Sequence, residues 1–285
     1  MPSLPDVRAI QETCGIVGRA REIEDLIACL AAARHVLVEG PVGVGKTALV
    51  QAVAGSLGRP FLRVDGDGRY SEARLVGAFD PPTVMARGYV PEAFQEGPLA
   101  RALEAGGVLF VNELNRMPEG VQNVLLPAMD EGRIEVPHLG TIRAAPGFAV
   151  VATQNPAEFV ATGHLSEALL DRFERVRLDY QDEAEERAIV ASRARLGPPP
   201  ELVAAAVAMV RATRSDPHVR RGASVRAAVA LADLATALGG DLDRAAALAL
   251  PTRLDLLDDR DHGIDEILGS LPKKVQGGSR GPRST

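Results

Sequence analysis

The 285-residue sequence contains no tryptophan, few aromatic residues and only two cysteines. Two cysteines exclude a disulfide framework, and Cys14 and Cys29 have no cysteine or histidine partner at a metal-ligand spacing. No apolar run approaches the roughly 18 residues that a membrane span requires, and the first ten residues lack the apolar centre of a secretory signal. We therefore expect a soluble cytoplasmic protein with reduced cysteines.

Charged residues narrow the function classes further. The net charge of −6 at pH 7 argues against a general nucleic-acid binder. The five histidines have no carboxylate or cysteine partner at metal spacing, so we expect each to be structural or exposed. Lysine occurs only at positions 46, 273 and 274, and arginine supplies nearly all of the positive charge.

Lys46 lies in a glycine-rich loop between a predicted strand and a predicted helix. Residues 40–47, GPVGVGKT, fit the pattern G-x-x-x-x-G-K-T, with the β-branched run 36–39 before the loop and an apolar helix after it. Glycines keep side chains away from backbone N–H groups that can bind phosphates, and a helix N-terminus adds a favourable dipole. We expect Lys46 to reach the β- and γ-phosphates of a nucleotide and the Thr47 hydroxyl to bind Mg²⁺.

The segment before the helix predicted at 19–33 could line an adenine site. This segment, GIVGR at 15–19, contains Val17, and a plain helix entry is the alternative interpretation. The predicted nucleotide-binding residues are Val17 and the loop with the start of its helix: Gly40, Pro41, Val42, Gly43, Val44, Gly45, Lys46, Thr47 and Ala48.

A second polar group follows the apolar run 108–111, which is typical of a strand buried on both faces of a parallel sheet. Asn112 and Glu113 stand at its C-terminal end, where such a sheet places groups that hold Mg²⁺ and orient the attacking water. Glu113 can act as general base. The aspartate usual before it is Asn112, and because an amide cannot neutralise Mg²⁺ as a carboxylate does, we expect weakened metal binding.

The remaining elements fit an alternation of strands and helices. The predictions are strands at 61–64 and 148–153, an irregular segment at 70–99, a helix at 121–131, and a hairpin of 133–136 against 141–144 with its turn around Leu139–Gly140. Gln154 and Asn155 end the last strand on the same edge as Glu113, where an amide can hold a water or the γ-phosphate. A helix from Ser166 leaves Arg172 and Arg175 near its end.

From Asp182 the chain is alanine-rich and is predicted to be wholly helical. The expected helices span 182–195, 201–214, 223–238 and 243–258, with a break at 197–200. This order predicts an α/β P-loop NTPase core, a parallel sheet flanked by helices, followed by a small all-α lid. The predicted domains are a core at 1–178, a lid at 179–270 and a disordered tail at 271–285.

Together these stretches resemble the AAA+ ATPases of the MoxR group, over about Ile16 to Asp258. The matching stretches are IVGR, EGPVGVGKTAL, VLFVNELNRMPEGVQNVLLPAMDEGRIEV, FAVVATQNPAEF, LSEALLDRF and GASVRAA. The resemblance implies Walker A at Gly40–Thr47, Walker B at Asn112 and Glu113, sensor 1 at Asn155, an arginine finger for the neighbouring subunit at Arg172 with Arg175 as second candidate, and sensor 2 at Arg226.

The resemblance also implies an assembly and a client. The helix-2 insert within 70–99 and the pre-sensor-1 hairpin 133–144 would face the pore of a ring, expected to be a hexamer. ATP with Mg²⁺ would drive chaperone-like remodelling or metal-cofactor maturation of a client protein, with a von Willebrand factor A domain protein as partner. Asn112 motivates an alternative, a hydrolysis-weak assembly scaffold. A nucleic-acid motor of the same superfamily is disfavoured by the acidic balance and by the lack of an appended helix-turn-helix.

Overall fold

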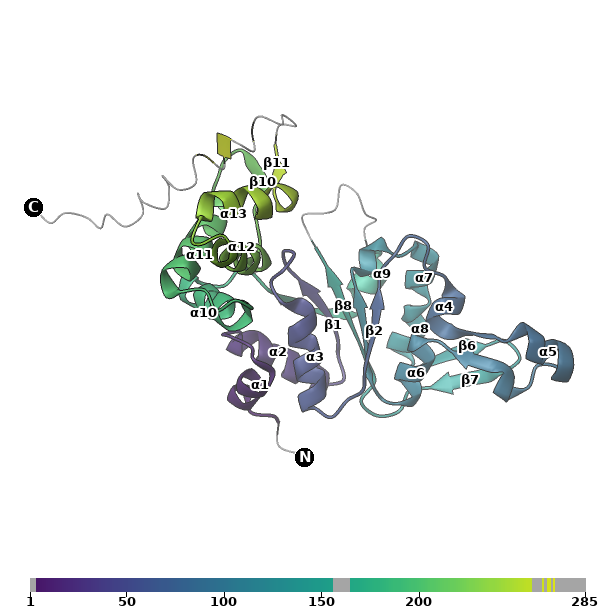
Figure 1. Ribbon diagram of the computed structural model, residues 1–285. Coiled ribbons are helices and arrows are strands. Elements are labelled where there is room, and N and C mark those ends of the chain that lie inside the picture. Colours follow the sequence, from purple (N-terminus) through teal and green to yellow (C-terminus); the bar gives the residue numbers. More distant parts are fainter. Residues whose placement is uncertain (1–3, 156–164, 258–262, 264–265, 268, 270–285) are drawn as a thin grey trace, which may run out of the picture. The chain divides into compact units, whose positions relative to one another are not determined.

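The computed structural model describes residues 4–155, 165–257, 263, 266–267 and 269 (Figure 1). The chain divides into two compact units, the first comprising Met1–Pro41 with Gly45–Asp179 and the second Val42–Val44 with Tyr180–Thr285. The tail predicted at 271–285 lies outside the described residues. Within the described ranges, no helix combines the length and the apolar character needed to cross a membrane.

A five-stranded parallel sheet forms the centre of unit 1, in the order β2-β5-β8-β1-β9. Its strands are β1 (His35–Glu39), β2 (Phe61–Asp65), β5 (Val108–Asn112), β8 (Ala149–Gln154) and β9 (Phe173–Arg177). Four of the five were predicted. The sequence does not predict β9, because a strand at the sheet edge with alternating charged residues buries only Val176 and lacks an apolar run.

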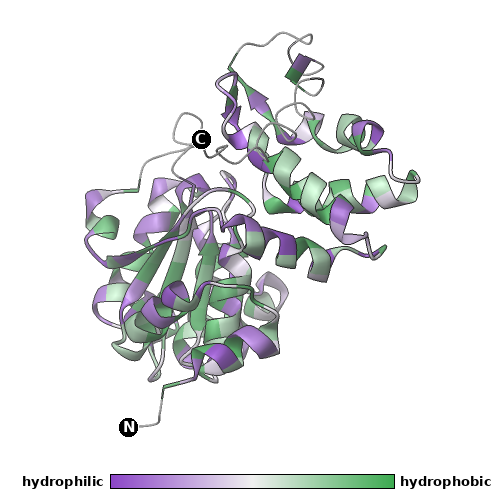
Figure 2. Ribbon diagram, turned by 90° about the vertical axis from the view of Figure 1, so that its left-hand side faces the viewer, coloured by the Kyte–Doolittle hydropathy of each residue, from purple (hydrophilic) through white to green (hydrophobic). Residues whose placement is uncertain are grey.

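Helices flank both faces of this sheet. The helices of unit 1, not all of which cover the sheet, are α1 (Val7–Cys14), α2 (Ala20–Ala31), α3 (Lys46–Ser56), α4 (Glu72–Val76), α5 (Pro81–Arg87), α6 (Pro98–Glu104), α7 (Glu119–Asn123), α8 (Leu125–Asp130) and α9 (Glu167–Leu170). Figure 1 shows α2 and α3 on one side of the strands and α6 and α8 on the other. The strands are the most hydrophobic part of the unit in Figure 2, as expected for a sheet covered on both faces.

Two helical predictions in unit 1 need correction. The polar lead forms α1, whose N-terminus is capped by the Asp6 carboxylate and which buries Ile10. The single helix predicted at 121–131 is two short helices, α7 and α8, which meet at Val124.

The segment predicted to be irregular at 70–99 contains regular structure. It holds α4, the antiparallel strands β3 (Gly77–Phe79) and β4 (Phe94–Glu96), α5 between them, and the start of α6. The hairpin is formed by β6 (Arg133–Val136) and β7 (Gly140–Arg143), so that Gly140 pairs in the strand instead of forming the turn. Tyr89 stacks on His138 with ring centroids 4.0 Å apart, which joins the segment before β4 to the turn of the hairpin. Figure 1 shows α5 beside this hairpin.

Unit 2 is mostly helical, but it also contains a small sheet. Its helices are α10 (Glu183–Arg193), α11 (Pro200–Arg214), α12 (Val225–Ala237) and α13 (Leu242–Ala249), and its antiparallel strands are β10 (Val219–Arg221) and β11 (Asp255–Leu256). The prediction of a wholly helical segment was therefore wrong at β10 and β11, and the last helix ends nine residues before the predicted position 258.

A buried ion cluster joins α10 to α11 within unit 2. Glu186 is buried and accepts from Arg214 Nη1 at 2.7 Å and from Arg211 Nη1 at 3.2 Å. The Arg214 guanidinium also stacks over the Tyr180 ring at 3.8 Å and donates through Nε to the Ala223 carbonyl. One buried carboxylate thus pairs with the largely buried Arg214 and with the partly exposed Arg211.

His35 is a structural histidine at the start of β1. Its Nδ1 accepts from the Val150 N–H at 3.0 Å, and its Nε2 lies 3.1 Å from the Met129 carbonyl oxygen. The neutral ring with its proton on Nε2 satisfies both contacts, and burial lowers the pKa of His35 below its ordinary value.

We expect the stability of unit 1 to decrease in acid partly because of His35. Its pKa is lower in the folded than in the unfolded chain, so the unfolded state binds more protons as the pH falls below about 6.5. Its contribution is therefore complete above that pH and is lost as the pH falls through the folded pKa. Thermal unfolding between pH 7.5 and 5 should show a smaller loss of melting temperature in His35→Gln than in the parent, with His138→Gln, at an exposed position of the same unit, measured for comparison.

Candidate nucleotide-binding site

The glycine loop leaves β1 at the carboxyl edge of the sheet and ends where α3 begins, at Lys46. Gly40 has φ 152°, and a β-carbon there would lie 2.2 Å from the Leu178 carbonyl oxygen, so only glycine fits. The Lys46 ammonium donates to the carbonyl oxygens of Gly40 at 2.6 Å and of Pro41 at 2.9 Å. The Lys46 ammonium therefore binds the first two carbonyl groups of the loop from the start of the helix that follows it.

The other predicted residues of the loop are divided between the two units. Thr47 and Ala48 begin α3 in unit 1, where the helix N-terminus provides the predicted dipole. Val42, Gly43 and Val44 group with unit 2. A β-carbon on Gly43 would lie 2.5 Å from the side chain of Ser224, so close packing within unit 2 requires glycine at this position.

Arg226 and Val17 lie at the ends of helices. Arg226 is in the first turn of α12, after the N-cap Ser224, and its Cδ is 3.9 Å from the position of that missing β-carbon on Gly43. Val17 is half-buried between α1 and α2, within a segment closed by a hydrogen bond from the Gln11 side chain to the Gly18 carbonyl.

Asn112 and Glu113 end β5 beside Thr153 of β8. The buried Thr153 hydroxyl donates to Asn112 Oδ1 at 3.0 Å and accepts from the Glu113 N–H at 2.9 Å. On the other side, Asn112 Nδ2 donates to Asp65 Oδ1 at 3.0 Å. The ends of β2, β5 and β8 are therefore linked by side-chain hydrogen bonds across the edge where β1 opens into the glycine loop.

Glu113 adopts an unusual backbone conformation at this edge. Its φ of 57° lies in the left-handed region, which costs a non-glycine residue roughly 1–2 kcal/mol. Its carboxylate pairs with Arg116 Nε at 3.0 Å, and a β-carbon on Gly66 would lie 2.1 Å from its carbonyl oxygen. Backbone strain held by such close packing is characteristic of functional positions.

Gln154 and Asn155 follow on β8, on the same edge and both buried. The Gln154 amide donates to Glu39, the last residue of β1, and Arg175 Nη1 approaches the same carboxylate at 3.8 Å. Unit 1 thus brings together Lys46, Thr47, Asn112, Glu113 and Asn155 at one edge of one sheet.

Arg172 lies at the opposite ends of the strands, where β1 and β9 begin. It immediately precedes β9, whose first residue pairs with His35 at the start of β1, so a strand length of about 16 Å separates it from the loop after Glu39. Its Nε donates to Asp130 Oδ1 at 2.6 Å, and this contact holds the pKa of Asp130 below its ordinary value. Arg175 lies in the middle of β9, not near a helix end as the sequence predicted.

The donors at this edge fit Mg²⁺ only in company with phosphates. Among the described residues, no cluster of three or more histidine, cysteine, aspartate or glutamate side chains could hold a metal. The Thr47 hydroxyl and the Asn112 amide oxygen are hard oxygen donors without charge, and Mg²⁺ commonly takes few protein ligands together with substrate phosphates and water. Lys46 and the N-terminus of α3 supply positive charge for those phosphates beside the loop.

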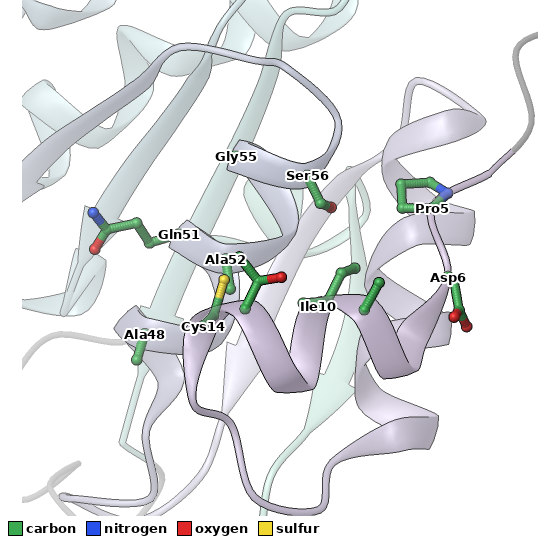
Figure 3. Close-up of a pocket in the computed structure, with 11 residues that line it drawn as sticks. Pro5, Asp6, Ile10, Cys14, Ala48, Gln51, Ala52, Gly55 and Ser56 are labelled. Carbon is green, nitrogen blue, oxygen red and sulfur yellow. The ribbon is translucent and has the colours of Figure 1, made fainter.

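A separate cavity of about 650 Å³ lies between α1 and α3 (Figure 3). Side chains from the two helices line it, among them Ile10, Cys14, Ala48 and Ala52. It extends along the flank of α3 to Ser56 and shares only Ala48 with the predicted nucleotide-binding residues. The cavity is therefore distinct from the candidate nucleotide site.

Sequence reasoning did not identify four residues that shape the edge. Asp65 and Gly66 follow the predicted strand at 61–64, Thr153 ends the strand predicted at 148–153, and Arg116 lies three residues after Glu113. The signal for Asp65 and Thr153 was available, since each is a polar residue at the carboxyl end of a parallel strand. No signal in the sequence indicated the pairing of β2 with β5, which makes Asp65 a neighbour of Asn112.

Comparisons with known proteins relate this chain to ATPases. Residues 35–173 match the family profile described as AAA domain (dynein-related subfamily). The gas vesicle ATPase GvpN2 of Halobacterium salinarum is 31% identical over 250 residues, which cover 82% of this chain and 71% of that protein. Protein NorQ of Paracoccus denitrificans is 33% identical over 218 residues, which cover 75% and 78% respectively. The matches to two other gas vesicle ATPases, from Haloferax mediterranei and Ancylobacter aquaticus, cover only 50% and 61% of the length of those proteins.

A solved structure shows the same fold. The RuvB Holliday junction branch migration motor of Thermotoga maritima aligns with a TM-score of 0.53, at 18% identity, over 81% of this chain and 70% of that one. At this identity the similarity concerns the fold alone.

Proposed function

We propose, because this chain belongs to the MoxR group of AAA+ ATPases, that it binds ATP with Mg²⁺ at residues 40–47 and hydrolyses it as one subunit of a ring. The observation that carries the proposal is the meeting of Lys46, Glu113 and Asn155 at one edge of the sheet of unit 1. ATP hydrolysis needs these three functions: a cation for the phosphates, a base for water and a polar group that orients the reactants.

Each residue would contribute one step. The Lys46 ammonium would leave the carbonyl oxygens of Gly40 and Pro41 for the β- and γ-phosphates. Glu113 would take the proton from the attacking water, which requires its carboxylate to turn away from Arg116. Asn155 would hold the water or a γ-phosphate oxygen. The metal, held by Thr47 and Asn112, would neutralise the charge of the phosphates.

The arginines would complete the site from other places. Arg226, at the start of α12, would act on the γ-phosphate as sensor 2. Arg172 is separated by a strand length from the loop of its own chain, which supports its use on the nucleotide of a neighbouring subunit. A ring, with a hexamer as the expected form, would bring the two edges of adjacent subunits together.

The client contacts would come from the projecting hairpins. The β3–α5–β4 segment and the β6–β7 hairpin would face the pore, joined by the stack of Tyr89 on His138. Hydrolysis would drive chaperone-like remodelling or metal-cofactor maturation of a client, with a von Willebrand factor A domain protein as partner.

Replacing Lys46 with alanine tests the nucleotide site directly. We expect ATP affinity to fall roughly 10- to 100-fold, the loss of charge-assisted hydrogen bonds to phosphate, with turnover falling along with it. The measurement is titration of a fluorescent ATP analogue into the purified chain. The control is Gln51→Ala, an exposed position on the same helix. Unchanged affinity in Lys46→Ala would place the nucleotide elsewhere.

A hydrolysis-weak scaffold is the second candidate function, and Asn112 is the observation that favours it. An amide at this position carries no charge to neutralise Mg²⁺. Steady-state turnover of the parent chain at saturating Mg²⁺ separates the two functions: nucleotide binding without turnover supports the scaffold, and measurable turnover supports the motor.

A further inference from the structure

Asp65 is the carboxylate nearest to Asn112 in the described hydrogen bonds, and it belongs to a strand that the predicted site does not include. In the register of β2 with β5, Asp65 stands directly opposite Asn112. The Gly66 N–H donates to the Asn112 carbonyl oxygen at 2.7 Å, so the backbone holds the two strand ends together. Arg63 binds the Asp65 carboxylate through both Nε and Nη2 and, together with the Asn112 amide, keeps the pKa of Asp65 below its ordinary value.

The hydrogen bonds around Asn112 determine which way its amide faces. The Thr153 hydroxyl accepts from the Glu113 N–H, so its own proton needs an acceptor, and Asn112 Oδ1 is that acceptor. The Asp65 carboxylate can only accept, so the group that faces it must be the Nδ2 amine. The reversed amide would bring two donors together on one side and two acceptors together on the other.

The strand order shows toward which side of β5 each end of the Asn112 amide points. Asp65 lies on the β2 side of β5, at the sheet edge, whereas Thr153 lies on the β8 side, next to β1 and its glycine loop. The amide oxygen of Asn112, the only atom of that side chain that can accept from a metal-bound water or bind a cation, therefore faces the nucleotide side.

We propose that Asp65 is a positioning residue for the metal side of the site: it binds the Asn112 amine and so turns the Asn112 oxygen toward Mg²⁺–ATP. The inference rests on the proposed function, since it assumes a metal–nucleotide complex at the loop. It also explains the amide itself. A carboxylate at 112 would stand about 3 Å from the Asp65 carboxylate, and like charges at that separation oppose each other. Asp65 and Asn112 thus complement each other: the negative charge is on Asp65 of β2, and the neutral hydrogen-bonding amide is on the neighbouring strand β5.

The proposal makes a pattern of predictions across four variants. Asp65→Ala removes the acceptor, frees the amide to reverse, and weakens metal affinity about 10- to 100-fold, the usual cost of losing an outer partner of a metal ligand. Asp65→Asn retains an acceptor oxygen for Asn112 Nδ2 and stays close to the parent. Asn112→Asp alone gives no gain, because the new carboxylate faces Asp65. The exchange Asp65→Asn with Asn112→Asp restores the donor–acceptor match, places a charge toward the metal, and binds metal more tightly than the parent.

The experiment measures metal binding instead of turnover. Mn²⁺ is titrated into each variant of the 285-residue chain saturated with a non-hydrolysable ATP analogue, and bound Mn²⁺ is followed by electron paramagnetic resonance. Nucleotide affinity in EDTA is measured alongside for every variant. Arg63→Ala is the control, because it removes the other partner of Asp65 and leaves the contact with Asn112.

The outcomes separate the inference from the function on which it rests. If the parent binds no nucleotide even with metal present, the proposed function fails. If nucleotide binds normally and Asp65→Ala retains the affinity of the parent for Mn²⁺, Asp65 does not position the amide. A gain in Asn112→Asp alone as large as in the exchanged pair would also overturn the inference, because Asp65 would then exert no effect on residue 112.

Discussion

Glu113→Gln should lower ATP turnover by about 10²- to 10⁴-fold and leave nucleotide affinity unchanged, since general-base catalysis contributes on that order and an amide cannot take the proton of water. The side chain keeps its size, so the left-handed backbone of Glu113 and the hydrogen bond from its N–H to Thr153 persist. Phosphate release at saturating ATP measures turnover, and titration of a fluorescent analogue measures affinity.

Glu119→Gln is the matched control for this prediction. It makes the same change six residues further along, at an exposed position in the first turn of α7, and should leave turnover unchanged.

Mixing Glu113→Gln subunits with Arg172→Ala subunits tests the arginine in the same assay. Partial recovery is expected if Arg172 serves a neighbour, whereas two inactive variants that stay inactive together would assign the arginine finger elsewhere. Turnover that survives in Glu113→Gln itself would remove this residue from the role of base.

Glu186→Ala should destabilise unit 2 by about 3–5 kcal/mol, because it leaves two arginines without their buried counter-charge. Arg214 is the more affected of the two. Its side chain is only 12% exposed and is held over Tyr180 and against the Ala223 carbonyl, so it cannot easily turn to water. Urea unfolding followed by circular dichroism, read as a change in midpoint, measures the loss.

Glu183→Ala provides the comparison on the same helix. Glu183 also pairs with an arginine, Arg187, but both side chains are nearly half exposed, and such pairs contribute roughly 0.3–0.5 kcal/mol. A loss of similar size in the two variants would mean that the cluster around Glu186 is solvated and carries no buried charge. Glu186→Gln, which keeps the volume and removes only the charge, should lie between them.

The positions of the candidate site residues in the fold were easier to predict from the sequence than several of the surrounding elements. Lys46, Glu113 and Asn155 could be predicted because each follows an apolar strand at the carboxyl end, where parallel strands gather their ends. That rule depends on local pattern and needs no knowledge of the strand order. Asp65 obeys the same rule, but its importance depends on β2 pairing with β5, a long-range choice that no local pattern encodes.

The elements that escaped prediction bury little. β9 is an edge strand with one buried residue, and β10 and β11 pair over only a few residues, so none produces the apolar run by which a buried strand is recognised. The segment at 70–99 is rich in glycine and proline, which indicates loops, yet its short strands β3 and β4 are held by a cluster of aromatic rings around Phe79. Tertiary packing decided the structure in each case.

The separation of Arg172 from the loop after Glu39 has a consequence for how the protein should behave on dilution. One end of the β1–β9 pair carries the glycine loop and the other carries Arg172, so in the proposed ring each chain would contact its neighbours head to tail through two different faces. The proposed contribution of Arg172 to a neighbour's site would then depend on the concentration of subunits. Specific activity should then depend on protein concentration, with ATP hydrolysis per chain falling as subunits separate.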